Sequence, residues 1–595
     1  MTDYSAPTRD MSFVIRELLD FDSIAALPGF EEVDGDVVEA ILEEAGKFSG
    51  EVLGPLNRSG DLEGAVWENK SVRAAKGFAE AYQQFVEGGW NGVAASPEYG
   101  GMGLPEVVAT ATQEMWQASN MSYSLCPMLT QGAVEALSHH GSEELKAIYL
   151  EKMVTGEWTG AMDLTEPQAG SDLSAVRTKA VPQGDGTYRL FGQKIFITWG
   201  DHDMADNIIH LVLARTPDAP EGVKGISLFL VPKFLVNEDG SLGARNDMHC
   251  ASIEHKLGIH ASPTCTMVFG DEDGAIGYLV GEEGKGLANM FTMMNEARHK
   301  VGVQGLAIAE RAYQQAVAYA KERVQGRAVG QQGAERLSII HHPDVRRMPM
   351  GMKAQIEAMR ALCYVAGAAM DVARRHADEG QRRAAQARVD LLIPVVKGWC
   401  TELGVEIAST GIQVHGGMGF VEETGAAQHL RDARITPIYE GTNGIQANDL
   451  VGRKLLRDGG SAMNALLEEM DAVISELQGA ETDALREALT TGVAALRRAS
   501  DFILSKGGED PLQAVANSFN YLMLSGYVIG GWLMARAALK AEQALADGAG
   551  DEAFYRAKLA TARFYATQIL PKADGYAAAV VAGADPVMAL DIEQF

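Results

Sequence analysis

One carboxylate in this chain has neighbours that suit acid–base chemistry, and it lies in residues 438–446 (IYEGTNGIQ). Glu440 follows an isoleucine and a tyrosine, and apolar neighbours raise the pKa of a carboxylate, so that it can hold a proton taken from a weak carbon acid. Gly441 lets the backbone approach a planar ligand closely, and Thr442 supplies a hydroxyl group. The alternative is a turn in which Thr442 or Asn443 caps the next helix, and this segment alone favours that interpretation.

A second candidate binding segment is residues 162–172 (MDLTEPQAGSD). Thr165 and Ser171 offer hydroxyl groups, and Gly170 frees backbone N–H groups to turn toward an acceptor such as a pyrophosphate or the edge of a flavin. The alternative is a turn that contains proline and glycine, with Ser171 as a cap. Taken alone, the segment favours the turn.

Three glycines follow a predicted helix end near Ile412, in residues 413–419 (QVHGGMG). They predict either a Schellman-type helix stop or a loop tight enough to receive a phosphate or an adenine. His415 is predicted to be structural, because no second histidine or acid stands at metal-ligand spacing. Three arginines on or after a long predicted helix could neutralise phosphates, although a single surface arginine usually has no such role: Arg298, Arg323 and Arg327.

Motifs of several common enzyme classes are absent from the sequence. It has no Gly-x-Gly-x-x-Gly after a strand, no Walker A loop, no His-Glu-x-x-His and no Gly-x-Ser-x-Gly. The sequence therefore excludes a Rossmann cofactor site, a P-loop, a zincin and a serine hydrolase of the usual kind, and it predicts no metal site.

Length and charge restrict the function further. A chain of 595 residues needs more than one hydrophobic core. Its net charge of −29 and pI near 4.9 disfavour nonspecific binding to nucleic acid or to an anionic membrane, so an anionic ligand must find local cations. The five cysteines lie far apart and suggest neither a disulfide framework nor a zinc site, so a reducing compartment, the cytoplasm, is expected: Cys126, Cys250, Cys265, Cys363 and Cys400.

Neither a signal peptide nor a membrane span is predicted. The N-terminus lacks a basic region followed by an apolar one. Residues 511–535 carry no charge and contain Gly526-x-x-x-Gly530, a spacing that also occurs in membrane helices. Several polar residues interrupt this stretch, which favours a buried helix of a soluble bundle instead.

The spacing of apolar residues divides the chain into helical and β-rich regions. Helical spacing of apolar residues runs from Asp36 to about Leu53 and continues through Val72 to Val86. No helical pattern separates the β-rich segments that follow, so they predict a mainly antiparallel sheet: residues 188–198, 207–214, 225–231 and 264–269. Helical patterns return from about Gly286, with one long run to Val324, and again over residues 455–582.

The predicted fold is therefore α+β and mostly α, with four domains. These are a helical N-terminal domain, a central β-domain, a helical domain and an additional helical domain, at residues 1–158, 159–284, 285–454 and 455–595.

Four motifs together resemble the acyl-CoA dehydrogenase family in their order and separation: residues 164–172, 194–198, 413–417 and 438–446. The resemblance covers roughly residues 35–455. It implies an N-terminal helical domain, a central β-domain and a C-terminal four-helix domain, with FAD between them. It also implies an FAD-dependent α,β-dehydrogenation of an acyl-CoA thioester to the enoyl-CoA.

The resemblance also implies roles for single residues, with Glu440 as the catalytic base. The residues that match cofactor contacts are Met162, Leu164, Thr165, Gly170, Ser171, Phe196, Ile197, Thr198, Arg323, Gln413, Gly416, Gly417, Thr442 and Gln446. The residues that match substrate contacts are Ser171, Asn295, Arg298, Tyr439, Glu440 and Gly441. In two places the chain departs from the family pattern. Phe196 stands where the family often has tryptophan, and Asn295 stands where it usually has aspartate, which weakens the expected CoA contact there.

The segment after Lys454 exceeds the short forms of the family. It resembles an extra helical domain of long members, which occupies the space that a second dimer fills in tetrameric relatives, so a homodimer is expected. The start of the chain and its length resemble a bacterial subgroup that acts on 3-(methylthio)propanoyl-CoA (3-methylmercaptopropionyl-CoA) in dimethylsulfoniopropionate catabolism. Relatives of the same length take straight-chain acyl-CoAs, and that alternative stays open.

Two further functions remain as alternatives. An oxidase would let oxygen reoxidise the flavin, whereas the expected dehydrogenase passes electrons to an electron-transfer flavoprotein. Some members of this fold bind DNA through a basic C-terminal domain. Here the segment after Lys454 mixes acidic residues with scattered arginines and has no basic stripe, so nucleic-acid binding is not expected.

Overall fold

The computed structural model describes residues 4–330 and 335–595, and it divides into two compact units. The sheet unit comprises residues 45–109 and 115–300, and the helical unit comprises residues 1–44, 110–114 and 301–595.

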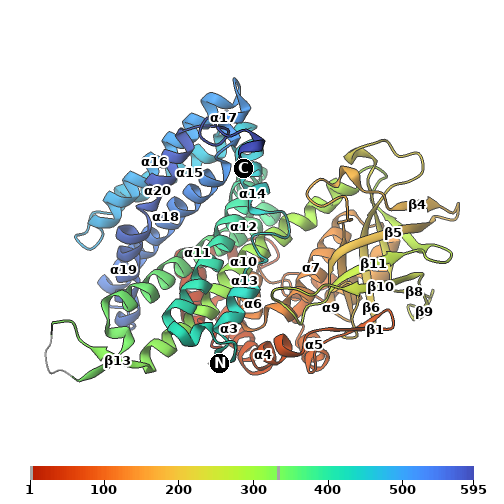
Figure 1. The fold of residues 1–595 in the computed structure, drawn as a ribbon, viewed down its shortest axis with the longest axis horizontal. Coiled ribbons are helices and arrows are strands. Elements are labelled where there is room, and N and C mark those ends of the chain that lie inside the picture. The colour runs from red at the N-terminus through yellow and green to blue at the C-terminus, as the bar shows by residue number, and fades with distance from the viewer. Residues whose placement is uncertain (1–3, 331–334) are drawn as a thin grey trace. The chain divides into compact units, whose positions relative to one another are not determined.

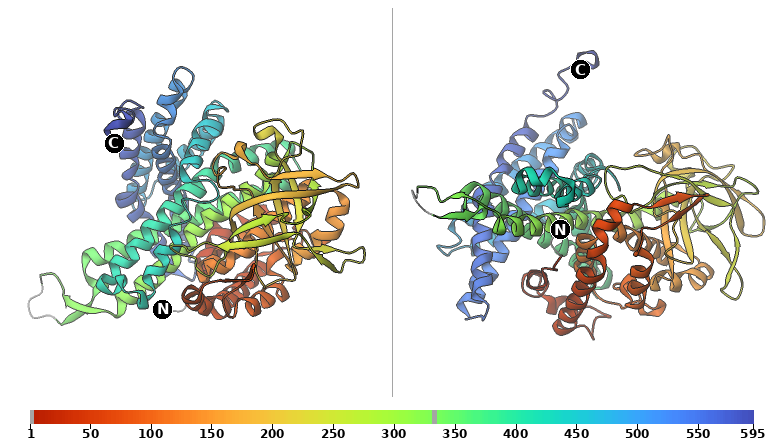
Figure 2. Two further views of the ribbon diagram at one scale, coloured as in Figure 1. Left: turned by 45° about the vertical axis from the view of Figure 1, so that its right-hand side comes forward. Right: turned by 60° about the horizontal axis from the view of Figure 1, so that its bottom comes forward.

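The sheet unit is built on an eight-stranded sheet with the strand order β10-β11-β5-β12-β7-β6-β3, to which β4 adds by pairing with β5. The long strand β5 (Thr187–Thr198) lies near the middle of the sheet, and only β3 and β6 pair in parallel. The other strands are β3 (Trp158–Asp163), β4 (Lys179–Pro182), β6 (Asn207–Ala214), β7 (Ser227–Pro232), β10 (Met248–Ile253), β11 (Thr264–Phe269) and β12 (Ala275–Val280). The prediction of a mainly antiparallel sheet is confirmed, and the four predicted strands correspond to β5, β6, β7 and β11. Figure 2 shows these strands in yellow.

Helices and a small hairpin complete the sheet unit. Two helices are α5 (Phe78–Glu87) and α7 (Met121–His140), and the hairpin consists of β1 (Val66–Glu68) and β2 (Ser71–Arg73). The helical pattern predicted to run from Val72 is therefore wrong at its start. Val72 pairs with Trp67 across the hairpin and packs into the core of the sheet, and the helix begins only after Gly77, whose φ of +88° breaks the pattern.

Three long helices form the centre of the helical unit: α10 (Gly286–Glu322, of which residues from 301 belong here), α11 (Pro343–Arg375) and α12 (Glu379–His415). Two short helices follow, α13 (Ala426–Ala433) and α14 (Asn443–Asp449). The helical run predicted to reach Val324 is wrong at its end, because Val324 lies in β13 (Val324–Arg327), which pairs with β14 (Arg336–Ser338). The two strands project at the end of α10 in Figure 1.

The residues after Lys454 form a second group of helices packed on the first, shown in blue in Figure 1. They are α15 (Ser461–Glu476), α16 (Asp483–Gly507), α17 (Pro511–Val515), α18 (Ser518–Ala546), α19 (Glu552–Phe564) and α20 (Lys572–Val581). In the part of the chain that the structure describes, α18 alone is long and apolar enough to span a membrane, and 89% of its most apolar window is buried. A Cβ on Gly526 would be too close to the indole of Trp399 on α12, and a Cβ on Gly530 would be too close to the hydroxyl of Tyr565 and would also crowd that indole. The glycine spacing therefore serves close helix packing inside the unit, and the prediction of a buried helix is confirmed.

A buried charge cluster joins the two ends of the chain inside the helical unit. Arg360 of α11 donates to Glu114 at 2.6 Å and to Glu310 at 2.8 Å, and it also contacts Asp10 near the N-terminus. Asp10 in turn contacts Lys558 of α19. Buried charges need partners, so each of these groups depends on the others.

Candidate active site

Glu440 lies on a short loop of the helical unit between α13 and α14. Its backbone has a φ of +56°, and the next residue, Gly441, has a φ of +83°. A residue other than glycine is strained at positive φ, so the surrounding structure must hold it there. Such strained residues are common at functional sites. The Glu440 side chain is half-buried.

Asn443 fastens this loop to α12. Its backbone N–H donates to the carbonyl of Pro437 at 3.0 Å, which closes the loop. Its side-chain oxygen accepts from Nζ of Lys397 at 2.9 Å, and its Nδ2 donates to Oε1 of Glu402 at 2.8 Å. The Lys397 side chain is completely buried. These bonds fix residues 437–443 against a long helix.

Thr442 and Gln446 hold the same turn from the other side. Thr442 is the N-cap of α14, and its hydroxyl accepts from the N–H of Ile445 at 3.3 Å. Nε2 of Gln446 donates to the carbonyl of Gly441 at 3.2 Å. The cap interpretation is therefore confirmed for Thr442, whereas Asn443 forms an anchor and does not cap. The capped turn and the strained Glu440 occur together.

Tyr439 contributes a second polar group beside Glu440. Its hydroxyl donates to Oε1 of Gln304 on α10. Burial and, to a lesser extent, the neighbouring Glu440 carboxylate raise the pKa of Tyr439, so its hydroxyl stays protonated at neutral pH.

In the sheet unit, residues 164–178 follow β3 and lie along β5. The carbonyl of Thr165 accepts from the N–H of Ile195 at 2.9 Å, while Gly170 and Ser171 are exposed. Asp172, and not Ser171, caps the short helical turn that follows, so the interpretation of Ser171 as a cap is wrong. The side chain of Ser171 is thus not used in a cap.

An ion pair that the sequence did not reveal lies beneath this segment. Nζ of Lys194 contacts Oε1 of Glu166 at 2.9 Å, and the two side chains are 0% and 4% exposed. Burial by itself raises the pKa of Glu166, but the Lys194 ammonium and the hydrogen bonds from Thr178 and Arg177 outweigh it and bring the pKa to about 2. The carboxylate is therefore charged at neutral pH. The sequence did contain one signal of this ion pair, a lysine inside an apolar strand at residues 194–198 (KIFIT). A lysine buried in such a strand needs a buried partner.

Phe196 occupies a bulge of β5. The register between β5 and β11 slips there, and Phe196 has a φ of +59° with 59% of its surface exposed. Ile197 is buried in the sheet core, and Thr198 is half-buried. The bulge thus turns an aromatic ring outward from a strand whose neighbouring residue points inward.

The other predicted contacts lie at four places. Met162 ends up buried on β3, and Leu164 is half-buried just after it. On α10, Arg298 is buried and Asn295 half-buried. Arg323 follows α10, where its guanidinium donates to the carbonyl of Val324 at 3.1 Å. Arg327 is exposed on β13.

The helix α12 extends to His415, three residues beyond the predicted end, and leaves Gln413 exposed in its last turn. Gly416 has a φ of +59° but a ψ of −141°, so the helix does not end in a Schellman stop and that interpretation is wrong. His415 donates from Nδ1 to the carbonyl of Gly411 at 2.7 Å and stacks on Tyr319, which confirms its structural role.

Comparisons with known proteins decide the family. Four family models match in order: "Acyl-CoA dehydrogenase, N-terminal domain" at residues 39–157, "middle domain" at 161–271, "C-terminal domain" at 284–455, and "Acetyl-CoA dehydrogenase C-terminal like" at 466–591. The chain is 52% identical to 3-methylmercaptopropionyl-CoA dehydrogenase of Ruegeria pomeroyi, over 95% of this chain and 96% of that protein. The chain belongs to the acyl-CoA dehydrogenase family.

Two more distant comparisons agree. This acyl-CoA dehydrogenase is 36% identical to a butyryl-CoA dehydrogenase of Syntrophomonas wolfei, over 96% of each chain. Its fold matches the crystal structure of a Bacillus anthracis acyl-CoA dehydrogenase complexed with FAD, with a TM-score of 0.73, 22% identity, and coverage of 94% of this chain and 90% of that one. The predicted family and fold class are thereby confirmed. The protein is an oxidoreductase that acts on CH–CH bonds, and its cofactor is FAD.

Three features of this acyl-CoA dehydrogenase fit FAD. The Phe196 ring is exposed at a strained backbone position, as a wall for a planar ring would be. Gly416 and Gly417 are exposed, and a Cβ on either would meet no atom within 4 Å among the described residues, which leaves room for a nucleotide. Oε1 of Gln446 is buried and has no hydrogen-bond partner among those residues, so it can accept a bond from a ligand.

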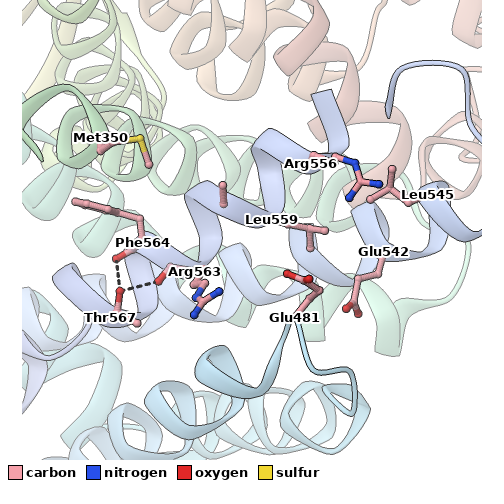
Figure 3. Close-up of a pocket in the computed structure, with 10 residues that line it drawn as sticks. Met350, Glu481, Glu542, Leu545, Arg556, Leu559, Arg563, Phe564 and Thr567 are labelled. Atoms are coloured by element: carbon pink, nitrogen blue, oxygen red, sulfur yellow. Dashed lines mark hydrogen bonds between the residues drawn. The ribbon is translucent and has the colours of Figure 1, made fainter. Parts of the chain in front are cut away.

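The described residues contain no group of three or more histidine, cysteine, aspartate or glutamate residues that could hold a metal ion. A pocket of about 650 Å³ lies among α11, α18 and α19 and contains none of the predicted site residues (Figure 3). Its lining mixes apolar and oppositely charged side chains, among them Phe564, Glu542 and Arg556.

Proposed function

We propose that Glu440 is the base that removes the α-proton of the acyl-CoA thioester. The observation that supports this is the loop itself, since a half-buried carboxylate at a strained φ is held by Asn443, Thr442 and Gln446. A base fixed in this way keeps its position while its charge changes from negative to neutral during turnover.

The thioester oxygen must be stabilised while the proton leaves, because an α-C–H is too weak an acid for a carboxylate alone. We assign that role to the backbone N–H of Glu440, in line with the family resemblance. Tyr439 and Gly441 complete the substrate side of the loop. In the sheet unit, Ser171, Asn295 and Arg298 are assigned to the CoA portion of the substrate.

Bound FAD would accept the hydride from the β-carbon, which completes the α,β-dehydrogenation. The chain's own contribution is to hold the ring. We assign this to residues of the sheet unit: Met162, Leu164, Thr165, Gly170, Ser171, Phe196, Ile197 and Thr198. The adenosine and pyrophosphate portions are assigned to residues of the helical unit: Arg323, Gln413, Gly416, Gly417, Thr442 and Gln446.

The test of the base is Glu440→Gln, which keeps the shape of the side chain but cannot accept the proton. Turnover is expected to fall by about 10²–10⁴-fold or more, with FAD still bound and acyl-CoA affinity retained. The measurement is anaerobic bleaching of the flavin absorbance after addition of acyl-CoA. Near-normal bleaching in this variant would remove Glu440 from the mechanism.

The proposed substrate is 3-(methylthio)propanoyl-CoA, which would give methylthioacryloyl-CoA in dimethylsulfoniopropionate breakdown. Its support is the 52% identity to the Ruegeria pomeroyi enzyme, against 36% to the butyryl-CoA dehydrogenase. Straight-chain acyl-CoAs are the alternative. Rates of flavin bleaching with butyryl-, octanoyl-, palmitoyl- and 3-(methylthio)propanoyl-CoA decide between them, and the proposal fails if any of the straight-chain acyl-CoAs bleaches the flavin faster than 3-(methylthio)propanoyl-CoA.

We propose an electron-transfer flavoprotein as the electron acceptor, a homodimer as the assembly and the cytoplasm as the compartment. The helices after Lys454 support the dimer by the resemblance to long members of the family. Reduction of an electron-transfer flavoprotein without peroxide supports a dehydrogenase, whereas stoichiometric peroxide would make the protein an oxidase. Light scattering of the FAD-loaded protein gives the number of subunits.

A further inference from the structure

The buried pair of Glu166 and Lys194 has more bonds than an ion pair needs. Both oxygens of Glu166 accept hydrogen bonds from the far end of its own segment. Oε1 accepts from the N–H of Thr178 at 3.0 Å and from its hydroxyl at 2.6 Å, and Oε2 accepts from the N–H of Arg177 at 2.8 Å. One carboxylate therefore closes residues 166–178 into a loop, and that loop includes Gly170 and Ser171.

Lys194 ties the start of the same loop to β5. Its Nζ donates to the carbonyl of Leu164 at 3.0 Å while it contacts Glu166, and the next residue, Ile195, donates to the carbonyl of Thr165 at 2.9 Å. Phe196 follows directly in the bulge. The pair thus sets the position of Thr165 and the start of the bulge together.

The charges of the pair matter as well as its bonds. Glu166 is adjacent in sequence to Thr165, and Lys194 is two residues before Phe196. Two opposite charges in contact nearly cancel outside the pair. Removal of either one leaves a net charge in a buried region, where charge is poorly screened.

We propose that Glu166 and Lys194 are positioning residues for the flavin, which fix the loop and the bulge that hold the ring and keep their surroundings electrically balanced. This inference rests on the proposed flavin contacts at Thr165 and Phe196. It goes beyond them because neither Glu166 nor Lys194 is assigned a contact with cofactor or substrate.

The test compares Glu166→Gln, Lys194→Met and Lys194→Arg with the unchanged protein. Three quantities are measured: the FAD dissociation constant, the midpoint potential of the bound flavin and the thermal unfolding of the FAD-free protein. E166Q and K194M are expected to weaken FAD binding at least tenfold. The potential should rise in E166Q, which removes a negative charge, and fall in K194M, which removes a positive one, while K194R restores it.

A matched control is Asp61→Asn. Asp61 is also 4% exposed at its side chain, belongs to the same unit and forms ion pairs with Arg58 and His260. D61N is expected to lower the unfolding temperature without changing FAD affinity or the flavin potential. If E166Q and K194M behave like D61N, the pair is only structural and the inference is overturned.

Three further variants keep the test decisive. Thr178→Val removes only the 2.6 Å hydroxyl bond to Glu166, so it keeps the ion pair and is expected to give a smaller change in the same direction as K194M. If E166Q and the Lys194 variants do not fold, T178V decides alone, and unchanged FAD affinity there overturns the inference. Phe196→Ala and Thr165→Val test the proposed flavin contacts separately, because both variants keep the Glu166–Lys194 pair. If those contacts are wrong, both variants would leave FAD affinity unchanged.

Discussion

Two loops carry the residues that we propose for chemistry, and each is fastened by one completely buried lysine. Lys194 contacts the carboxylate of Glu166 at 2.9 Å in the sheet unit. Lys397 contacts the amide oxygen of Asn443 at the same distance in the helical unit. The first contact therefore joins a lysine to a carboxylate, whereas the second joins a lysine to an uncharged amide.

This difference suits the tasks of the two loops. Glu440 gains a proton in each turnover, so a titratable anchor on its own loop would couple the position of the base to its protonation state. The amide of Asn443 has no proton to gain or lose near neutral pH, so the anchor on the loop itself keeps the same charge through turnover. The loop of residues 164–178 carries no proposed proton acceptor, and there an ion pair can also set the local charge.

The largest expected effect that separates the two anchors comes from Lys397→Met. It removes the ammonium donor of Asn443, and a buried acceptor that loses a donor costs about 1–3 kcal/mol of folding stability. Misplacement of the base by about 1 Å is expected to lower kcat about 100-fold with FAD retained. Steady-state kinetics on FAD-loaded protein measure this. The matched control is Lys558→Met, another buried lysine of the same unit, which contacts Asp10 and Glu357.

In Lys558→Met the free energy of unfolding should fall by about 3–5 kcal/mol, because a buried ion cluster loses one member, but kcat per folded molecule should not change. Equal losses of kcat in K397M and K558M would show that general destabilisation, and not the anchor, explains the effect.

Low pH is expected to weaken the ion-pair anchor at Glu166 but not the amide anchor at Asn443. The pKa of Glu166 is about 2 in the folded protein and near 4.5 when unfolded, so its contribution to stability is complete above pH 4.5 and is lost as the pH falls toward 2. The difference in urea midpoint between the unchanged protein and E166Q should therefore shrink over that range, by an amount equivalent to about 2–3 kcal/mol. The corresponding difference for K397M should persist, since the amide of Asn443 does not titrate there. A difference in urea midpoint between the unchanged protein and E166Q that stays constant down to pH 3 would contradict the lowered pKa of Glu166.

The same contrast explains what the sequence could predict. Local patterns were sufficient for β5, β6, β7 and β11, which are rich in β-branched and aromatic residues, and for the cap formed by Thr442. They were insufficient for β3 (WTGAMD), which has few such residues and becomes a strand by pairing with β6, almost fifty residues away. Val72 was misassigned because a single buried valine fits both a helix and a hairpin.

Both anchors also lay beyond local patterns. Lys194 and Glu166 are 28 residues apart and Lys397 and Asn443 are 46 apart, so only the tertiary fold brings them together. The sequence did contain a signal for each lysine, since both stand in apolar stretches, residues 194–198 and 391–400 (LLIPVVKGWC). A buried lysine requires a partner, but nothing in the sequence says which residue that is.

The smallest expected effect concerns Thr442, whose hydroxyl caps α14 next to the amide-anchored loop. Thr442→Ala removes the acceptor of the Ile445 N–H and should cost about 1 kcal/mol of stability, whereas Thr442→Ser keeps the oxygen and should cost less. Gln446 still holds the carbonyl of Gly441 at 3.2 Å, so kcat should fall less than tenfold. Kinetics and FAD affinity of the two variants check this. A loss in T442A as large as that in K397M would mean that the cap, and not the buried lysine, fixes the base, and the comparison of the two lysines would then lose its basis.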